Sequence, residues 1–103
     1  MTSTQTKPPL AWACNQNGRI LAKMEFQNNT SHQVDAGIDS KICHKEFTVN
    51  AYSSVTISVP AYTYYYFGYI GSGAGFGGLV SLSDDIHTWV LYISDTGAVL
   101  ETP

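Results

Sequence analysis

Charged residues are scarce in this chain of 103 residues. Asp, Glu, Lys and Arg make up 13% of it, about half the share usual for a globular protein. The five basic residues are scattered in a chain of net charge −3, so no basic stripe can follow a phosphate backbone. We therefore expect no nucleic-acid partner. The polar surface must come from Ser, Thr, Asn, Gln, Gly and Tyr, which is typical of extracellular β-proteins and of subunits that pack together.

Long apolar runs are also absent. No uncharged apolar run approaches the roughly 20 residues that span a bilayer, and no basic segment leads into an apolar one at the N-terminus. We therefore expect no membrane span. Residues 1–9 are instead a polar segment that ends in Pro8-Pro9. We expect them to form an N-terminal arm, with one domain over residues 10–103 because a core of this size fits a single domain.

Cysteine occurs only at positions 14 and 43. A disulfide between Cys14 and Cys43 would contribute about 3 to 4 kcal/mol in the chain-entropy model, a large fraction of the stability of so small a domain. The alternative is a pair of reduced thiols in a cytosolic protein. We predict the disulfide and, with it, a secreted or cell-surface protein.

Period-two alternation predicts strands along most of the chain. It is clearest in residues 19–28, and the turn signal Asn15-Gln16-Asn17-Gly18 predicts that residues 10–15 pair back on them as a hairpin. Pro60 cannot donate to a strand ladder, so it marks an edge, a bulge or a bend. Further strands are predicted at 32–38, 41–49, 55–59, 61–70, 79–82, 87–94 and 98–101.

Seven to nine short strands and no convincing helical window predict an all-β fold. We expect a small antiparallel two-layer sandwich or jelly-roll, of immunoglobulin-like or Greek-key type. A parallel sheet is not expected, because no connection is long enough to hold a crossover helix. Residues 71–78 contain five glycines and are expected to form an irregular loop.

Aromatic residues dominate the predicted strand at 62–69, and in a strand they divide between two faces. They are Tyr62, Tyr64, Tyr65, Tyr66, Phe67 and Tyr69. Buried tyrosine hydroxyls need hydrogen-bond partners, so we expect one face to point outward. That face is either the one with Tyr62, Tyr64 and Tyr66 or the one with Tyr65, Phe67 and Tyr69. An outward tyrosine row suits recognition; the alternative is aromatic pairing that only stabilises the sheet.

Phe76 lies within the glycine-rich segment 71–78. We expect it at the tip of a flexible loop, where it would anchor a partner; the alternative is a connection without a binding role. A phosphate cradle is not indicated, because residues 79–82 are predicted as a strand and no helix follows the glycines.

Gly68-Tyr69-Ile70-Gly71-Ser72 resembles a segment of the small bacterial proteinaceous α-amylase inhibitors. Those inhibitors are β-sandwiches with two disulfides, and they act through an exposed Trp-Arg-Tyr triplet. The resemblance covers these five residues alone. This chain has no such triplet and can form one disulfide at most, so no functional residue is carried over.

Catalytic and metal-binding patterns are weak. Cys43 and His44 are adjacent, so on a strand they point to opposite faces and cannot form a thiol-protease pair. Cys43 with His87 and an aspartate remains a spatial alternative, without a glycine-framed turn to support a nucleophile. The aspartates are Asp84 and Asp85. The three histidines do not have the spacing of a structural zinc site, and we expect no metal, no cofactor and no enzymatic activity.

The predicted function is a non-catalytic binding module, secreted or surface-exposed, that engages a protein or a carbohydrate. Its contact surface would be the aromatic strand at 62–69 together with Phe76. The alternative is a self-assembling subunit of a capsid, fibre or coat, whose N-terminal arm docks on a neighbouring copy in a homo-oligomer.

Overall fold

The computed structural model describes residues 14, 20–71, 73–83 and 88–102. In these residues the chain forms strands and no α-helix, so none of them belongs to a helix that could cross a membrane. The strands are β1 (Leu21–Asn28), β2 (Val34–Asp39), β3 (His44–Val49), β4 (Ser54–Pro60), β5 (Tyr62–Ile70), β6 (Gly75–Leu82), β7 (Trp89–Ser94) and β8 (Gly97–Glu101). The predicted arm at residues 1–9 lies outside the described residues.

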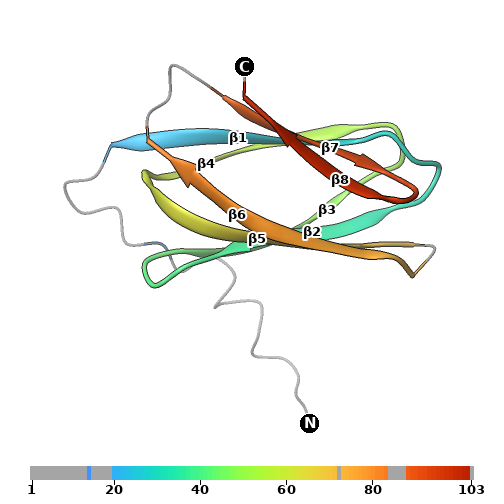
Figure 1. Ribbon diagram of the computed structural model, residues 1–103, viewed down its shortest axis with the longest axis horizontal. Coiled ribbons are helices and arrows are strands. Elements are labelled where there is room, and N and C mark those ends of the chain that lie inside the picture. The colour runs from blue at the N-terminus through green and yellow to red at the C-terminus, as the bar shows by residue number, and fades with distance from the viewer. Residues whose placement is uncertain (1–13, 15–19, 72, 84–87, 103) are drawn as a thin grey trace, which may run out of the picture.

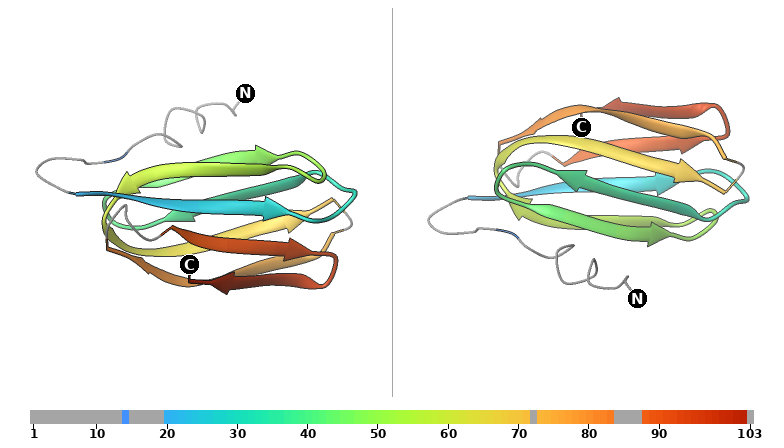
Figure 2. Two further views of the ribbon diagram at one scale, coloured as in Figure 1. Left: turned by 90° about the horizontal axis from the view of Figure 1, so that it is seen from above. Right: turned by 90° about the horizontal axis from the view of Figure 1, so that it is seen from below.

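The strands form two sheets that pack face to face as a β-sandwich (Figure 1). Sheet I has the order β4-β1-β7-β8, and sheet II has the order β3-β2-β5-β6. Figure 2 shows sheet I from above and sheet II from below. Consecutive strands stay in one sheet at β2–β3, β5–β6 and β7–β8, and the other connections pass from one sheet to the other. The predicted all-β sandwich is confirmed.

Strand β1 corrects one expectation. It pairs antiparallel with β4 on one side and parallel with β7 on the other. Both of its edges are therefore occupied, and the predicted hairpin with residues 10–15 is wrong. Neither sheet is parallel: the strand pairings are antiparallel apart from that of β1 with β7, two strands that are far apart in sequence. The chain between them runs through five other strands, so no crossover helix is required.

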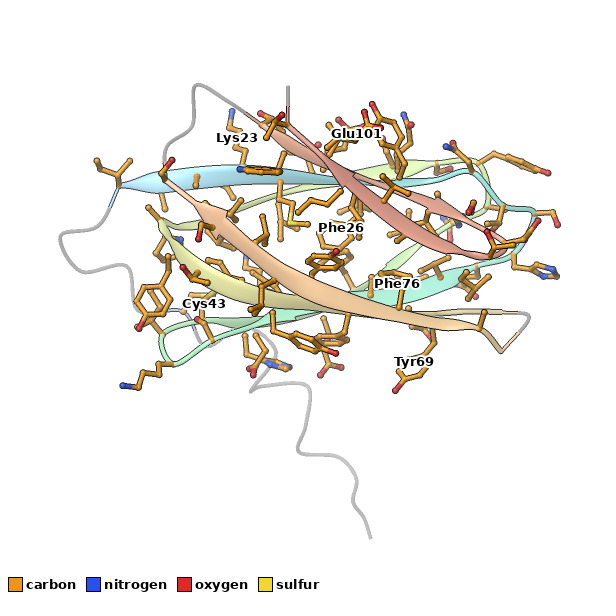
Figure 3. All side chains as sticks on the ribbon, in the orientation of Figure 1. Lys23, Phe26, Cys43, Tyr69, Phe76 and Glu101 are labelled. Atoms are coloured by element: carbon orange, nitrogen blue, oxygen red, sulfur yellow. A yellow bond between two sulfur atoms is a disulfide. The ribbon has the colours of Figure 1, made fainter. Side chains whose placement is uncertain are left out.

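The core lies between the sheets and is filled by alternate residues of each strand. Phe26 of sheet I meets Phe47 of sheet II edge to face, with ring centroids 4.8 Å apart. Figure 3 shows Phe26 and Phe76 between the two sheets. The apolar side chains of the core are those of Ala22, Met24, Phe26, Val34, Ala36, Ile38, Cys43, Val49, Ile57, Val59, Tyr64, Tyr66, Ile70, Val80, Leu82, Leu91 and Ile93.

Pro60 is the last residue of β4, an edge strand of sheet I, as its missing N–H requires. After Pro60 the chain passes into sheet II and begins β5. The hydroxyl of Tyr64 donates a buried hydrogen bond of 2.6 Å to the Pro60 carbonyl oxygen. This bond joins the end of one sheet to the start of the next and satisfies a phenol that is fully buried.

The glycine-rich segment differs from the predicted irregular loop. Residues 75–78 belong to β6, which pairs with β5 through to Tyr69↔Gly75. The reversal between the strands is short, and the N–H of Gly73 donates to the Ile70 carbonyl oxygen at 2.7 Å. Gly73 has a φ of 104°, which L-residues rarely adopt. The glycines of β6 allow the aromatic rings of β5 to lie close to the sheet, an effect that strand propensity does not capture.

Cys14 and Cys43 form a disulfide, as predicted. Cys14 also forms a β-bridge with Cys43, which directly precedes β3. The cross-link therefore attaches the chain near its N-terminus to sheet II.

Candidate functional site

The outer face of sheet II carries most of the predicted binding residues that reach the surface. Tyr65, Phe67 and Tyr69 alternate with buried residues along β5 and point away from the core. We call these three the aromatic row. Tyr65 is 48% exposed and Tyr69 is 67% exposed, and Figure 3 shows Tyr69 projecting from sheet II on the side away from sheet I. The face open to solvent is thus that of Tyr65, Phe67 and Tyr69.

The other predicted binding residues point inward. Tyr64 is fully buried and Tyr66 is nearly so, and neither can reach a partner on this face. Tyr62 and Phe76 are half-buried and pack against the core. Phe76 lies on β6 with its ring over Gly68, so its predicted place at a loop tip is wrong. The reason is that the glycine-rich segment continues as a strand and turns Phe76 toward the interior.

Glycines on the strands beside β5 make room for the aromatic row. A Cβ atom at Gly37 on β2 would lie 2.6 Å from Cζ of Phe67. On β6, a Cβ atom at Gly77 would meet the hydroxyl of Tyr65, and one at Gly75 would lie 3.4 Å from the Tyr69 ring. Phe67 therefore lies over β2, whereas Tyr65 and Tyr69 lie over β6. The three rings spread across neighbouring strands as a broad aromatic surface.

The rings on this face are also ordered relative to one another. The ring centroids of Tyr65 and Phe67 lie 6.2 Å apart, with planes inclined by 23°. On its other side Phe67 stacks on the His44 ring, with centroids 6.2 Å apart and planes inclined by 28°. Each of these stacked rings restricts the motion of its neighbour, so they keep little conformational freedom.

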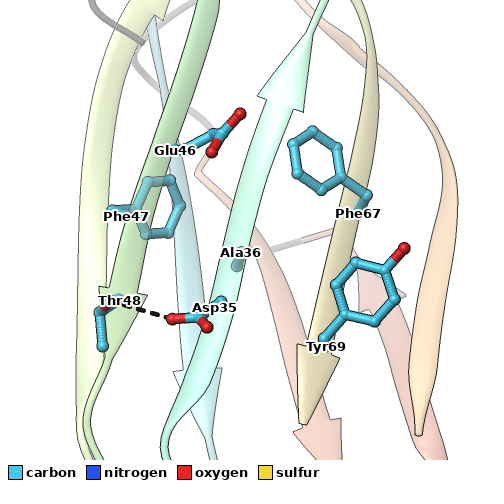
Figure 4. A pocket seen from close by; sticks show the side chains of 7 residues that line it. All are labelled: Asp35, Ala36, Glu46, Phe47, Thr48, Phe67 and Tyr69. Atoms are coloured by element: carbon cyan, nitrogen blue, oxygen red, sulfur yellow. Dashed lines mark hydrogen bonds between the residues drawn. The ribbon is translucent and has the colours of Figure 1, made fainter. Parts of the chain in front are cut away.

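A shallow groove of about 460 Å³ runs beside the aromatic row, across β2 (Figure 4). Phe67 and Tyr69 line it on the β5 side, and Glu46 and Thr48 line it on the β3 side. Asp35 of β2 lies between them, and its Oδ1 accepts a hydrogen bond of 3.1 Å from the Thr48 hydroxyl. The groove thus has aromatic rings on one side and carboxylates opposite them.

His44 is held by two carboxylates at the edge of this face. Its Nδ1 lies 2.8 Å from Oδ1 of Asp39, and its Nε2 lies 2.7 Å from Oε2 of Glu46. Burial acts most strongly on the pKa of His44 and lowers it, but the hydrogen bonds to Asp39 and Glu46 and the attraction of both charges together raise the pKa above 6.5. Protonated His44 neutralises part of the negative charge of the face.

The disulfide removes the catalytic alternative at Cys43. A cysteine in a disulfide has no thiol and cannot act as a nucleophile. Its suggested partners His87, Asp84 and Asp85 lie outside the described residues. Among the residues that the structure describes, no group of three His, Cys, Asp or Glu side chains could hold a metal ion.

The residues around the aromatic row could not be assigned to this face from the sequence. Gly37, Asp35 and Glu46 meet Phe67 and Tyr69 only because β2 lies between β3 and β5. Alternation in residues 32–38 does place Asp35 and Gly37 on the side opposite Val34 and Ala36. It carries no information on which strands lie beside them.

Comparisons with known proteins support the fold alone. No protein-family model and no curated protein sequence matches the chain significantly. Among solved structures, the chain is similar to an NMR structure of a protein from Eubacterium rectale, with a TM-score of 0.60 and 17% sequence identity. The match covers 86% of this chain and 94% of the other. At this identity the similarity identifies a shared β-sandwich architecture and says nothing about the ligand.

Proposed function

We propose that the protein is a non-catalytic binding module and that the outer face of sheet II is its contact surface for a protein or a glycan. The observation that carries this proposal is the aromatic row, in which Tyr65 and Tyr69 are exposed and the rings of Tyr65 and Phe67 stack on each other. Exposed, contiguous aromatic rings with restricted motion are typical of recognition surfaces.

The surroundings of the row support this role. The neighbouring glycines leave room for the rings of Phe67 and Tyr65 to lie close to the backbone of β2 and β6. Asp35 and Glu46 add hydrogen-bond acceptors along the same groove, and polar groups of this kind orient a ligand that the rings hold. Aromatic pairing within the sheet does not require this combination.

We also propose that the protein is secreted or displayed at a cell surface. The Cys14–Cys43 disulfide supports this location, because disulfides persist in oxidising compartments and are rare in the cytosol.

The first test compares ligand binding by a variant that lacks exposed tyrosines of the aromatic row with binding by a variant that lacks an exposed tyrosine elsewhere. Immobilised protein is probed with an array of defined oligosaccharides and with a displayed library of random peptides. The double variant Tyr65→Ala/Tyr69→Ala should bind the ligands selected with the wild type about tenfold more weakly or worse, because central aromatic contacts typically contribute more than 1 kcal/mol each. Tyr52→Ala serves as the control, since Tyr52 is 73% exposed and lies in the turn before β4.

Equal binding by the wild type and the Tyr65→Ala/Tyr69→Ala variant would refute the proposed face.

The alternative function, a self-assembling subunit, has one feature in its favour: Leu79 of the edge strand β6 is 72% exposed beside Tyr65. Light scattering at two protein concentrations separates the two functions. A mass that rises with concentration, and falls when Leu79 is replaced by Lys, would favour assembly.

A further inference from the structure

We infer that the groove beside the aromatic row binds a cationic side chain, an arginine, presented by a protein partner. This inference rests on the proposed function and names the ligand chemistry of the same face. The groove combines two features that together recognise a cation: aromatic rings on one side, from Phe67 and Tyr69, and carboxylates opposite them, from Asp35 and Glu46.

On the described outward positions of sheet II, carboxylates outnumber the groups that can carry a positive charge. In the described part of the chain, no outward position of β2, β3, β5 or β6 holds a lysine or an arginine. Lys45 has the inward register on β3, with its Nζ 3.5 Å from the Ser58 carbonyl oxygen of sheet I. His44, which can carry a positive charge on this face, forms its ion pairs with Asp39 and Glu46.

Asp35 is oriented for a ligand in the groove. Its carboxylate accepts a hydrogen bond from Thr48, which fixes one oxygen. In the strand register Asp35 lies opposite Thr48 on one side and Tyr69 on the other. A cation that enters between Tyr69 and Asp35 therefore meets a ring and a carboxylate together, and both attract it.

The charge of the groove favours an arginine over a neutral sugar. A sugar hydroxyl can donate to Asp35, but it leaves the negative charge of Asp35 uncompensated when it displaces water. A guanidinium compensates that charge, stacks on an aromatic face and can bind a carboxylate with two parallel hydrogen bonds. The groove volume of about 460 Å³ is sufficient for a single side chain, since pockets for small ligands span roughly 300 to 1,000 Å³.

The test uses two short peptides that differ in one atom group. One is an acetylated and amidated peptide with a single arginine among Gly and Ser, and the other has citrulline, the uncharged isostere, in its place. Each is titrated into the full ¹⁵N-labelled, oxidised chain and followed by amide chemical shifts. The arginine peptide should shift amides of β2, β3 and β5 around the groove, and citrulline should weaken binding by roughly three- to tenfold.

Asp35→Asn should weaken binding of the arginine peptide by a similar factor, while its side-chain amide retains an oxygen that can accept from the Thr48 hydroxyl. Glu101→Gln makes the same change in net charge on β8 of sheet I, where Figure 3 shows Glu101 on the far side of the molecule from Tyr69. It should leave the affinity unchanged. Added salt should lower the affinity for the arginine peptide more than the affinity for the citrulline peptide.

Equal affinity for the two peptides, equal effects of Asp35→Asn and Glu101→Gln, or shifts outside the groove would each overturn the inference. A neutral oligosaccharide that binds the wild type and is lost in Tyr65→Ala/Tyr69→Ala would overturn it while leaving the proposed function intact. The converse outcome is also distinguishable. If the arginine peptide binds with the expected charge dependence, but the selected ligands bind the wild type and Tyr65→Ala/Tyr69→Ala equally well, the proposed function fails and the cation site is supported.

Discussion

His44 connects three strands of sheet II through one ring. It lies on β3, its Nδ1 contacts Asp39 of β2, and its ring stacks on Phe67 of β5. Glu46, two residues further along β3, contacts the other ring nitrogen. Since both nitrogens face carboxylates, the protonated ring satisfies both contacts, whereas the neutral ring has one N–H to donate. The charge state of His44 thus affects how firmly the edge of the aromatic surface is held.

The raised pKa of His44 predicts a pH-dependent contribution to stability. Because the folded pKa lies above the ordinary value of 6.5, protonation favours the folded state. This stabilisation is complete below about pH 6.5 and is lost as the pH rises through the folded pKa. Asp39→Asn should therefore lower the free energy of unfolding more at about pH 5.5 than at about pH 8.5, as measured by urea denaturation. NMR titration should show a lower pKa of His44 in this variant.

Asp35→Asn is the matched control for this pH dependence. It removes a carboxylate from the same strand, but this carboxylate is hydrogen-bonded to Thr48, whereas that of Asp39 is paired with His44. Its effect on stability should not follow the titration of His44. An equal loss at both pH values in Asp39→Asn would show that the Asp39–His44 contact does not stabilise the fold.

At the scale of the strand, β5 divides its aromatic side chains between the core and the surface. The inward side obtains a hydrogen-bond partner for Tyr64 from the Pro60 carbonyl. The outward side depends on the strands beside it, because Gly37 and Gly77 leave room for Phe67 and Tyr65. Glycine usually weakens a strand, so its presence here is explained by close contact with aromatic rings.

Gly37 and Gly75 should respond differently to replacement by alanine. A Cβ atom at Gly37 meets the backbone carbonyl oxygen of Lys45 on β3 as well as the Phe67 ring, and backbone in a paired strand moves only with strain. Gly37→Ala should lower the free energy of unfolding by about 1 to 3 kcal/mol. Gly75→Ala makes an ordinary contact of 3.4 Å with Tyr69 and should change it by less than about 1 kcal/mol.

Urea denaturation of both variants beside the wild type measures this difference. Similar stabilities for Gly37→Ala and Gly75→Ala would mean that β2 and β3 can move apart slightly without loss of stability. The close approach of Gly37 to the Lys45 carbonyl oxygen would then not restrict this position.

At the scale of the whole molecule, the disulfide is the one covalent link between distant parts of the described chain. It joins Cys14 to Cys43 across 29 positions of sequence and so restricts the unfolded chain. The double variant Cys14→Ala/Cys43→Ala should lower the free energy of unfolding by about 3 to 4 kcal/mol. For a domain of this size, each kcal/mol corresponds to a fall of about 4 to 8 °C in Tm.

Calorimetry and urea denaturation of the oxidised wild type and the double variant measure this contribution. The wild type with a reducing agent is the internal control and should resemble the variant. A loss below about 1 kcal/mol in both would show that the unfolded chain is already restricted without the bond.

Alternation and turn residues predicted much of the fold. They placed strands close to β1, β2, β4 and β5, and the inward positions of β1 agree with Ala22, Met24 and Phe26 in the core. The failures share a cause. The pairing of residues 10–15 with β1, the loop at residues 75–78 and the position of Phe76 all depend on which strand lies beside which, and local pattern does not contain that information.

The sequence by itself determined that strands form, that one side of each is apolar and that the aromatic residues of β5 must divide between two faces, because side-chain direction alternates along an extended chain. Only the tertiary structure decided which half faces solvent. Sheet I packs against Tyr64 and Tyr66, so Tyr65, Phe67 and Tyr69 point outward. The order of the strands then places Gly37, Asp35 and Glu46 beside the rings, because contacts across a sheet arise from pairing between segments distant in sequence.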